Sequence, residues 1–224
     1  MTATGLSDAE RMDRHYRYQR FIYDLTRTHY LIGRKHLIAD LKPARSQSVL
    51  EIGCGTAWNL IKASEMYPEA RIFGVDVSAA MLDTARNSIS RSGLADRIRV
   101  ATADATDFSA ANVFGIASPD RVFFSYALSM IPGWRQALRV AAGQVAPGGR
   151  LHIVDFGQCE NLPRAFKTAL FAFLRHYTVT PRADLESECR NVAADEGLTL
   201  SFERLHRGYT DYAVLTRPPH DTAS

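Results

Sequence analysis

Three carboxylates stand at the ends of short apolar runs that are rich in β-forming residues. Glu51 lies in "SVLEIG" (48–53), Asp76 follows "RIFGV", and Asp104 ends "RIRVATAD". If these runs are neighbouring parallel strands, their carboxyl ends meet at one edge of the sheet, which is where ligands of open α/β sheets bind. Carboxylates gathered there would attract a positively charged ligand and accept hydrogen bonds from its hydroxyl and amino groups.

A glycine-containing turn, "GCGTAWN", follows the first run and would face the same edge. Gly53 and Gly55 let the backbone approach a ligand closely, and the N-terminus of the next helix offers unpaired N–H groups. A dinucleotide fingerprint would have glycine or alanine where this chain has Trp58, and a phosphate-binding P-loop would continue with Gly-Lys-Ser or Gly-Lys-Thr. Because Glu51 would also repel a pyrophosphate, the turn favours a cationic nucleoside such as S-adenosylmethionine.

These residues must be positioned by an alternation of β-rich and helical runs that begins at residue 46. Such alternation is typical of parallel βαβ units with helices on both faces of a sheet. We therefore predict an α/β fold with a doubly wound, mostly parallel, seven-stranded sheet. The expected strands begin near residues 48, 71, 97, 120 and 150, and the expected helices cover 59–67, 79–93 and 134–145.

The last third of the chain departs from this alternation. The runs "LTLSFERLH" and "TDYAVLTR" are too close in sequence for a parallel crossover, so they predict an antiparallel C-terminal hairpin. Before the hairpin, the amphipathic stretch "PRAFKTALFAFLRHY" predicts a helical insertion. The expected parts are a basic, aromatic N-terminal helical cap (1–45), the main domain (46–217) with its insertion (157–196), and a flexible tail (218–224).

Length and composition indicate one ordinary globular protein. The chain has 224 residues and a formal net charge of +3. No run approaches the roughly eighteen apolar residues that span a bilayer, and the first residues lack the apolar core of a secretory signal. Three cysteines without a Cys-x-x-Cys pair or a Cys/His cluster argue for reduced thiols and against bound metal. We therefore expect a cytoplasmic protein.

Four motifs, in this order, resemble those of the class I S-adenosylmethionine-dependent methyltransferases. They are "VLEIGCGT", "GVDVSAAMLDTAR", "ATADATDF" and "VAPGGRLHIVDF", and together they cover about residues 46–156. The resemblance implies a Rossmann-like methyltransferase fold, whose antiparallel seventh strand suits the predicted hairpin. It also implies S-adenosylmethionine as the cofactor.

The resemblance also implies which residues hold the cofactor. The glycine turn would contact the methionine part, Asp76 the ribose, Met81 the adenine ring, and Asp104 with Ala105 the adenine edge. Singly, each aspartate could instead cap a helix. The chain has "GTAW" where "GTG" is usual, so Trp58 is either a wall of the methionine pocket or a packing residue under the cap. The predicted cofactor-binding residues are Glu51, Gly53, Cys54, Gly55, Asp76, Val77, Met81, Asp104, Ala105 and Ser125.

Two further stretches bear on the methyl acceptor. "YDLTRTHYLIGR" (23–34) and "FFSYALSMIPGW" (123–134) resemble a bacterial betaine-lipid branch, the diacylglyceryl-homoserine N-methyltransferases. This implies three methyl transfers to the amine of a lipid headgroup, giving diacylglyceryl-trimethylhomoserine. Tyr126 is the candidate proton acceptor, and its aromatic face would hold a cationic headgroup. The predicted substrate-binding residues are Tyr23, Arg27, Tyr30, Arg34 and Tyr126.

The partners that we expect are the lipid headgroup and an anionic membrane surface. In the N-terminal segment an apolar stripe lies beside an arginine stripe, which suits either packing on the sheet or binding of a carboxylate or lipid phosphate. Nucleic acid is not expected, because no Asp/Asn/Ser-Pro-Pro-Tyr/Phe motif follows the fourth strand. Two alternatives remain: methylation of phosphatidylethanolamine or a quinone precursor, and a non-catalytic S-adenosylmethionine-binding partner of another enzyme.

Overall fold

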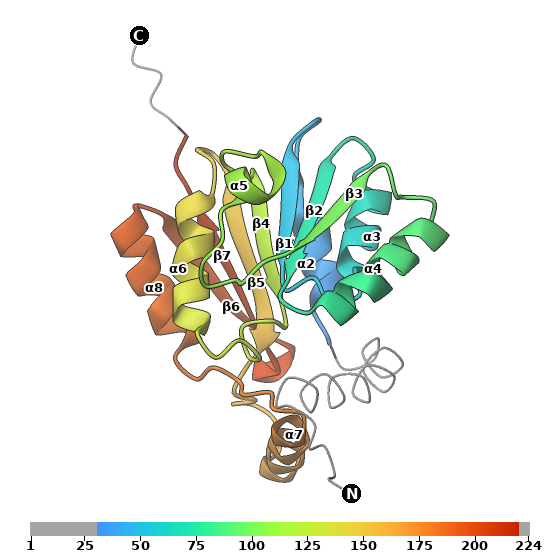
Figure 1. Cartoon of the computed structure of the whole chain (residues 1–224). Coiled ribbons are helices and arrows are strands. Elements are labelled where there is room, and N and C mark those ends of the chain that lie inside the picture. Colours follow the sequence, from blue (N-terminus) through green and yellow to red (C-terminus); the bar gives the residue numbers. More distant parts are fainter. Residues whose placement is uncertain (1–30, 220–224) are drawn as a thin grey trace, which may run out of the picture. The chain divides into compact units, whose positions relative to one another are not determined.

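The computed structural model describes residues 31–219, and these form a seven-stranded sheet with helices on both faces (Figure 1). The strand order is β3-β2-β1-β4-β5-β7-β6. The first five strands are parallel, and β7 inserts antiparallel between β5 and β6. This confirms the predicted α/β class and the C-terminal hairpin. The strands are β1 (Ser48–Ile52), β2 (Arg71–Asp76), β3 (Ile98–Thr102), β4 (Arg121–Ser125), β5 (Arg150–Phe156), β6 (Thr199–Leu205) and β7 (Thr210–Thr216).

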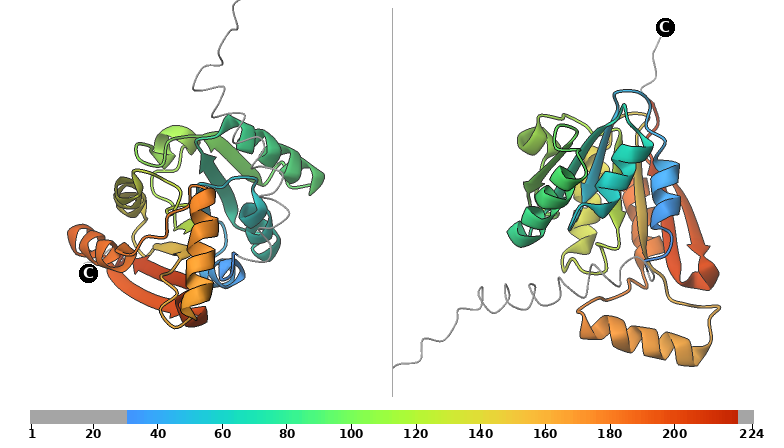
Figure 2. Two further views of the ribbon diagram at one scale, coloured as in Figure 1. Left: turned by 90° about the horizontal axis from the view of Figure 1, so that it is seen from below. Right: turned by 90° about the vertical axis from the view of Figure 1, so that its right-hand side faces the viewer.

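Seven α-helices of the described chain surround the sheet. Helices α2, α3 and α4 cover one face, and α5, α6 and α8 cover the other (Figures 1 and 2). The short helix α5 was not predicted. None of the helices in residues 31–219 is long and apolar enough to cross a bilayer. The helices are α2 (Arg34–Leu41), α3 (Trp58–Met66), α4 (Ala79–Arg91), α5 (Ala110–Phe114), α6 (Trp134–Gln144), α7 (Arg164–His176) and α8 (Leu185–Glu196).

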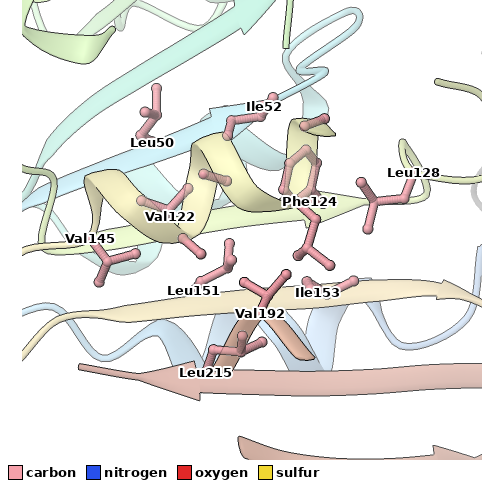
Figure 3. Close-up of a cluster of buried hydrophobic side chains, with 14 of the residues drawn as sticks. Leu50, Ile52, Val122, Phe124, Leu128, Val145, Leu151, Ile153, Val192 and Leu215 are labelled. Atoms are coloured by element: carbon pink, nitrogen blue, oxygen red, sulfur yellow. The ribbon is translucent and has the colours of Figure 1, made fainter. Parts of the chain in front are cut away.

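The larger core lies between the sheet and helices α5, α6 and α8. Strands β1 and β4 are buried along their whole length, as expected for central parallel strands covered on both faces. Figure 3 shows side chains of β1, β4, β5 and β7 meeting Val145 and Val192 in this core. Burial of this apolar surface fixes the strands, and therefore fixes where each strand ends.

Helix α2 packs on the sheet, although the sequence assigned it to the N-terminal cap. Arg121 of β4 donates from Nε to the carbonyl of Leu41 at 2.6 Å and from Nη2 to that of Lys42 at 3.3 Å. The Tyr212 hydroxyl of β7 donates to the Asp40 carboxylate at 2.8 Å. The structure therefore places the boundary near Gly33 rather than at residue 45, because these bonds tie α2 to the strands.

The predicted helical insertion also divides into two unlike parts. Helix α8 packs on α6 and on strands β6 and β7, so it belongs to the body of the sheet domain. Only one residue of α7, Leu174, is buried. Both ends of the segment that carries α7 are tied to the carboxyl edge of the sheet, where the candidate site lies.

Candidate functional site

The carboxyl ends of β1 and β2 bring the glycine turn and Asp76 together. Asp76 accepts a hydrogen bond from the Gly55 amide at 2.8 Å and another from the Ser78 amide at 2.9 Å. The first bond ties the turn to the neighbouring strand. The second, with the Ser78 hydroxyl that accepts from the Met81 amide, shapes the start of α4. The cap of α4 is therefore Ser78 and not Asp76, whose carboxylate lies at the ligand edge of the sheet.

Asp104 lies just beyond the next strand, β3, at the same edge. It accepts hydrogen bonds from the amide and the hydroxyl of Thr106, at 2.8 and 2.7 Å, and these bonds lower the pKa of the carboxyl. Its side chain is exposed, whereas Ala105 beside it is half-buried. Asp104 is therefore an ionised acceptor in reach of solvent, as binding of an adenine amino group requires.

Three alternate residues of the glycine turn have left-handed backbone conformations. Gly53 and Gly55 have φ angles of 76° and 52°, and Ala57 has a φ of 67°. The sequence treated Ala57 as a small change, but the structure shows a residue with a Cβ atom in a conformation that favours glycine. Ala57 thus takes the position of the usual third glycine, and α3 begins at the next residue, Trp58.

Backbone strain at Ala57 leads to a testable result. Ala57→Gly is expected to leave the free energy of unfolding unchanged or to raise it by up to about 1 kcal/mol. Glycine relieves the backbone strain, but it also raises the entropy of the unfolded chain, which offsets part of the gain. Ala57→Val is expected to lower it by more than 1 kcal/mol, roughly, because a β-branched residue is least tolerant of positive φ. Urea denaturation of the three proteins compares these values, and equal stability of the valine variant would contradict the assignment.

Trp58 and Arg34 pack against each other beside this turn. The Arg34 guanidinium carbon lies 4.2 Å from the centre of the Trp58 ring, and only 6% of Arg34 is exposed. Gly33, which precedes it, has a φ of 95°, and a Cβ atom there would lie 3.0 Å from Val154 of β5. The structure therefore favours the packing role for Trp58. Binding of an anion by Arg34 stays a prediction.

The buried Glu51 is held by a residue that sequence reasoning missed. Asn59, in the first turn of α3, donates from Nδ2 to Glu51 Oε1 at 2.6 Å. Asn59 is only 7% exposed, and its Oδ1 has no hydrogen-bond partner among residues 31–219. An unused buried acceptor beside a carboxylate suits the ammonium group of an amino-acid ligand. The sequence feature that could have indicated this contact is the position of Asn59, eight residues after Glu51 and on the helix that follows the glycine turn.

Exposed apolar surface at the end of β2 also fits an adenosine. Val77 follows Asp76 and is 69% exposed, and Met81 on α4 is half-buried. A base placed against these side chains would cover them while the ribose hydroxyls reach the Asp76 carboxylate. On the other side of the turn, Ser125 ends β4, and its buried hydroxyl has no hydrogen-bond partner in the described part of the chain. The residues at this edge therefore fit S-adenosylmethionine.

Cys54 lies within the turn, and its thiol is buried. Burial raises the pKa of this thiol well above its usual value, and the charges of Glu51 and Asp76 raise it further. A thiol in this state is neither a nucleophile nor a metal ligand at neutral pH. Its placement is that of a packing residue against the ligand edge.

Tyr126, the predicted proton acceptor, begins the loop after β4. It is 3% exposed with a φ of 57°, and its hydroxyl lies 3.1 Å from the hydroxyl of Thr210 on β7. Burial raises the pKa of the phenol, so the hydroxyl stays protonated and is a poor base. Its ring meets Phe156 edge-on at 4.6 Å. The geometry therefore favours an aromatic wall for Tyr126. The other predicted substrate residues, Tyr23, Arg27 and Tyr30, lie outside the described residues.

A pair of buried aspartates next to this loop was also missed. Asp155 of β5 stands opposite Asp211 of β7 in the antiparallel register. Asp155 accepts a bond from the Ser129 amide at 3.0 Å, and burial raises the pKa of its carboxyl. Burial and the nearby Glu160 and Asp155 charges raise the pKa of Asp211 to about 7, although Arg204 opposes them. Only the strand order, which sequence reasoning did not specify, brings the two carboxyls together.

Asp211 is expected to make stability depend on pH. The pKa of the Asp211 carboxyl is higher in the folded protein than in the unfolded chain. The stability that the protonated carboxyl contributes is therefore fully present below about pH 4 and is lost as the pH rises to about 7. At pH 8 the Asp211→Asn variant should therefore be more stable than the unmodified protein by about 1–2 kcal/mol, and it should unfold at a higher temperature. This gain in stability should be smaller at pH 5. Asp195→Asn, on the exposed side of α8, is the control. Thermal unfolding at both pH values tests this, and a gain independent of pH would contradict it.

Comparisons with known proteins agree with this geometry. Residues 49–149 match the family model described as "Methyltransferase domain". A demethylmenaquinone methyltransferase of Listeria monocytogenes is 28% identical over 144 residues, which are 64% of this chain and 58% of that protein. The chain thus matches just over half the length of such curated relatives.

Solved structures share the fold at lower identity. An O-methyltransferase family 2 protein from Planctomyces limnophilus aligns over 96% of this chain and 63% of its own, with 19% identity and a TM-score of 0.68. The phosphoethanolamine N-methyltransferase 2 of Haemonchus contortus aligns over 83% of this chain and 52% of its own, with 17% identity and a TM-score of 0.65. These structures confirm the predicted fold, and residues 49–149 match the model of a methyltransferase domain.

Proposed function

We propose that this protein transfers methyl groups from S-adenosylmethionine to the amine of a lipid headgroup. The acceptor that we favour is diacylglyceryl-homoserine, which would become the trimethylated betaine lipid. The support for this acceptor is the resemblance of the segments at 23–34 and 123–134 to that branch, together with the aromatic surroundings of the second segment.

The observation that carries the proposal is a row of four aromatic rings. From Tyr126 the row continues to Phe156 at 4.6 Å between ring centres, to Tyr209 at 6.0 Å, and to Phe166 of α7 at 6.3 Å. It runs from the loop after β4 to α7, on which Phe166 and Phe173 are exposed. Aromatic faces stabilise quaternary ammonium groups. Because Tyr126, Phe156 and Tyr209 are buried, the row would form the wall of a pocket for an amine that becomes more cationic with each methyl group.

The chemistry requires positioning more than acid–base catalysis. The cofactor supplies an electrophilic methyl group on a sulfonium sulfur. The neutral amine nitrogen would form the new N–C bond as the C–S bond breaks, and the electron pair of the C–S bond would stay on sulfur. After the first and second transfers the methylated nitrogen would release a proton to solvent, which restores a neutral amine for the next transfer. The Asn59–Glu51 pair would hold the cofactor's ammonium group and Asp76 its ribose. Holding the amine in line and free of water supplies most of the acceleration.

Incubation with S-adenosylmethionine carrying a labelled methyl group, and with separate lipid acceptors, tests the proposal. Diacylglyceryl-homoserine should give mono-, di- and trimethylated products in turn, identified by mass spectrometry, and Asp76→Ala should give little product. No label in this lipid, with label in another acceptor, would overturn the choice of acceptor.

A quinone precursor is the second candidate acceptor. It is favoured by the relatives named demethylmenaquinone methyltransferase, at 28% identity. Including demethylmenaquinone in the same assay separates the two candidates. The third possibility, a non-catalytic partner protein, would be supported if the protein bound S-adenosylhomocysteine but methylated no lipid fraction.

A further inference from the structure

Helix α7 presents most of its surface to solvent. Phe166 is 45% exposed and Phe173 is 43% exposed, whereas Leu174 is buried. Figure 2 shows α7 standing off the carboxyl edge of the sheet at the end of two long connections. Exposed apolar groups of this kind are typical of surfaces that meet another molecule.

The charge of the segment indicates the chemistry of that partner. Residues 161–183 contain no aspartate or glutamate. They contain four cations, of which Arg164, Lys167 and Arg175 lie on α7 and Arg182 follows it. The Lys167 ammonium lies 5.3 Å from the centre of the Phe171 ring, so cationic and apolar groups share one surface. A basic face beside exposed phenylalanines is complementary to a bilayer with anionic headgroups. Aromatic side chains enter the interface of such a bilayer, and cationic side chains pair with its phosphate groups.

Both ends of the segment are fixed at the candidate site. Before α7, the Cys159 amide donates to the carbonyl of Gly208 at 2.7 Å. After α7, the Thr180 amide donates to the carbonyl of Ser129 at 2.9 Å, and Arg182 donates from Nε to that of Leu128 at 3.0 Å. Ser129 and Leu128 belong to the same loop as Tyr126. The helix is therefore tethered to the loop that we assign to the methyl acceptor.

We propose that α7 docks on an anionic lipid bilayer and so delivers the headgroup to the loop after β4. This inference rests on the proposed function for its purpose, but the docking itself does not depend on which lipid is methylated. Docking by α7 puts the aromatic row, which ends at Phe166, in line between the bilayer and Tyr126. The substrate could then remain in the membrane while its headgroup reaches the cofactor.

Vesicle binding by the whole protein tests this proposal. Vesicles of phosphatidylcholine alone are compared with vesicles that also contain phosphatidylglycerol, and bound protein is measured by co-sedimentation. The α7 variants are Phe166→Ser with Phe173→Ser, and Lys167→Glu. The matched control combines Met66→Ser and Lys62→Glu on α3, where Met66 is 52% exposed.

The expected result is binding to phosphatidylglycerol vesicles only, weakened at least tenfold in each α7 variant and unchanged in the control. Binding of S-adenosylhomocysteine and the melting temperature should not change in any variant. Two results would overturn the proposal: α7 variants that bind as well as the unmodified protein, or a large drop in melting temperature, which would mean that the chain itself or a second copy covers α7. Docking without lipid methylation would refute the proposed function and leave this inference standing.

Discussion

Asp76→Ala is expected to weaken the binding of S-adenosylhomocysteine at least tenfold, or about 1.4 kcal/mol. The variant loses the acceptor for the ribose hydroxyls. It also loses the bonds to the amides of Gly55 and Ser78, which shape the turn and the start of α4. Both losses act on the ligand edge and not on the core, so the melting temperature should fall much less than the affinity. Isothermal titration calorimetry measures the effect.

A matched control is available on α4, the helix that follows Asp76. Asp83 on α4 is a surface acid paired with Arg86, and its side chain is 74% exposed. Asp83→Ala should leave affinity unchanged, because an exposed ion pair contributes little and lies away from the turn. If Asp76→Ala bound as tightly as Asp83→Ala, the cofactor site would have to be sought elsewhere in the chain.

Gly53→Ala is expected to destabilise the protein by roughly 2–4 kcal/mol, because two costs add. Gly53 has a φ of 76°, and a Cβ atom there would lie 2.8 Å from the Cβ atom of Ala127. The turn after β1 and the loop after β4 touch at this point, so an added methyl group pushes apart the two segments that form the site. Cofactor affinity should fall together with stability.

Gly148→Ala separates the two costs. Gly148 has a φ of 72°, but nothing lies within 4 Å of its Cβ position. This variant should therefore lose only about 1 kcal/mol, the cost of the left-handed conformation, and should bind cofactor normally. Equal losses in the two variants, measured by urea denaturation, would show that the loop carrying Ala127 moves aside without cost.

The sequence predicted the features that depend on strand direction alone. Runs such as "SVLEIG" and "RIFGVD" are apolar because central parallel strands are buried on both faces, and their acidic ends share an edge because the strands are parallel. Asp76 and the glycine turn could therefore be placed together without coordinates. The hairpin followed from the short connection between β6 and β7.

Features that depend on the rotation of a helix or on strand order could not be predicted in this way. The bond from Asn59 to Glu51 requires the rotation of α3 about its axis, which the strained residue Ala57 sets. The pairing of Asp155 with Asp211 requires β7 to insert beside β5. Helix α2 was assigned to the N-terminal cap because the residue that bonds it to the sheet, Arg121, lies 80 residues after its partner Leu41 in the sequence.

The three buried cysteines have a practical consequence for experiments on this protein. Burial raises the pKa values of Cys54, Cys159 and Cys189, and that of Cys189 rises to about 12. All three should therefore be unreactive toward maleimides while the protein is folded. A single cysteine introduced on the exposed side of α7 would then carry a fluorescent label alone, without removal of the native thiols. Its emission would report directly on the polarity that this helix meets at a vesicle surface.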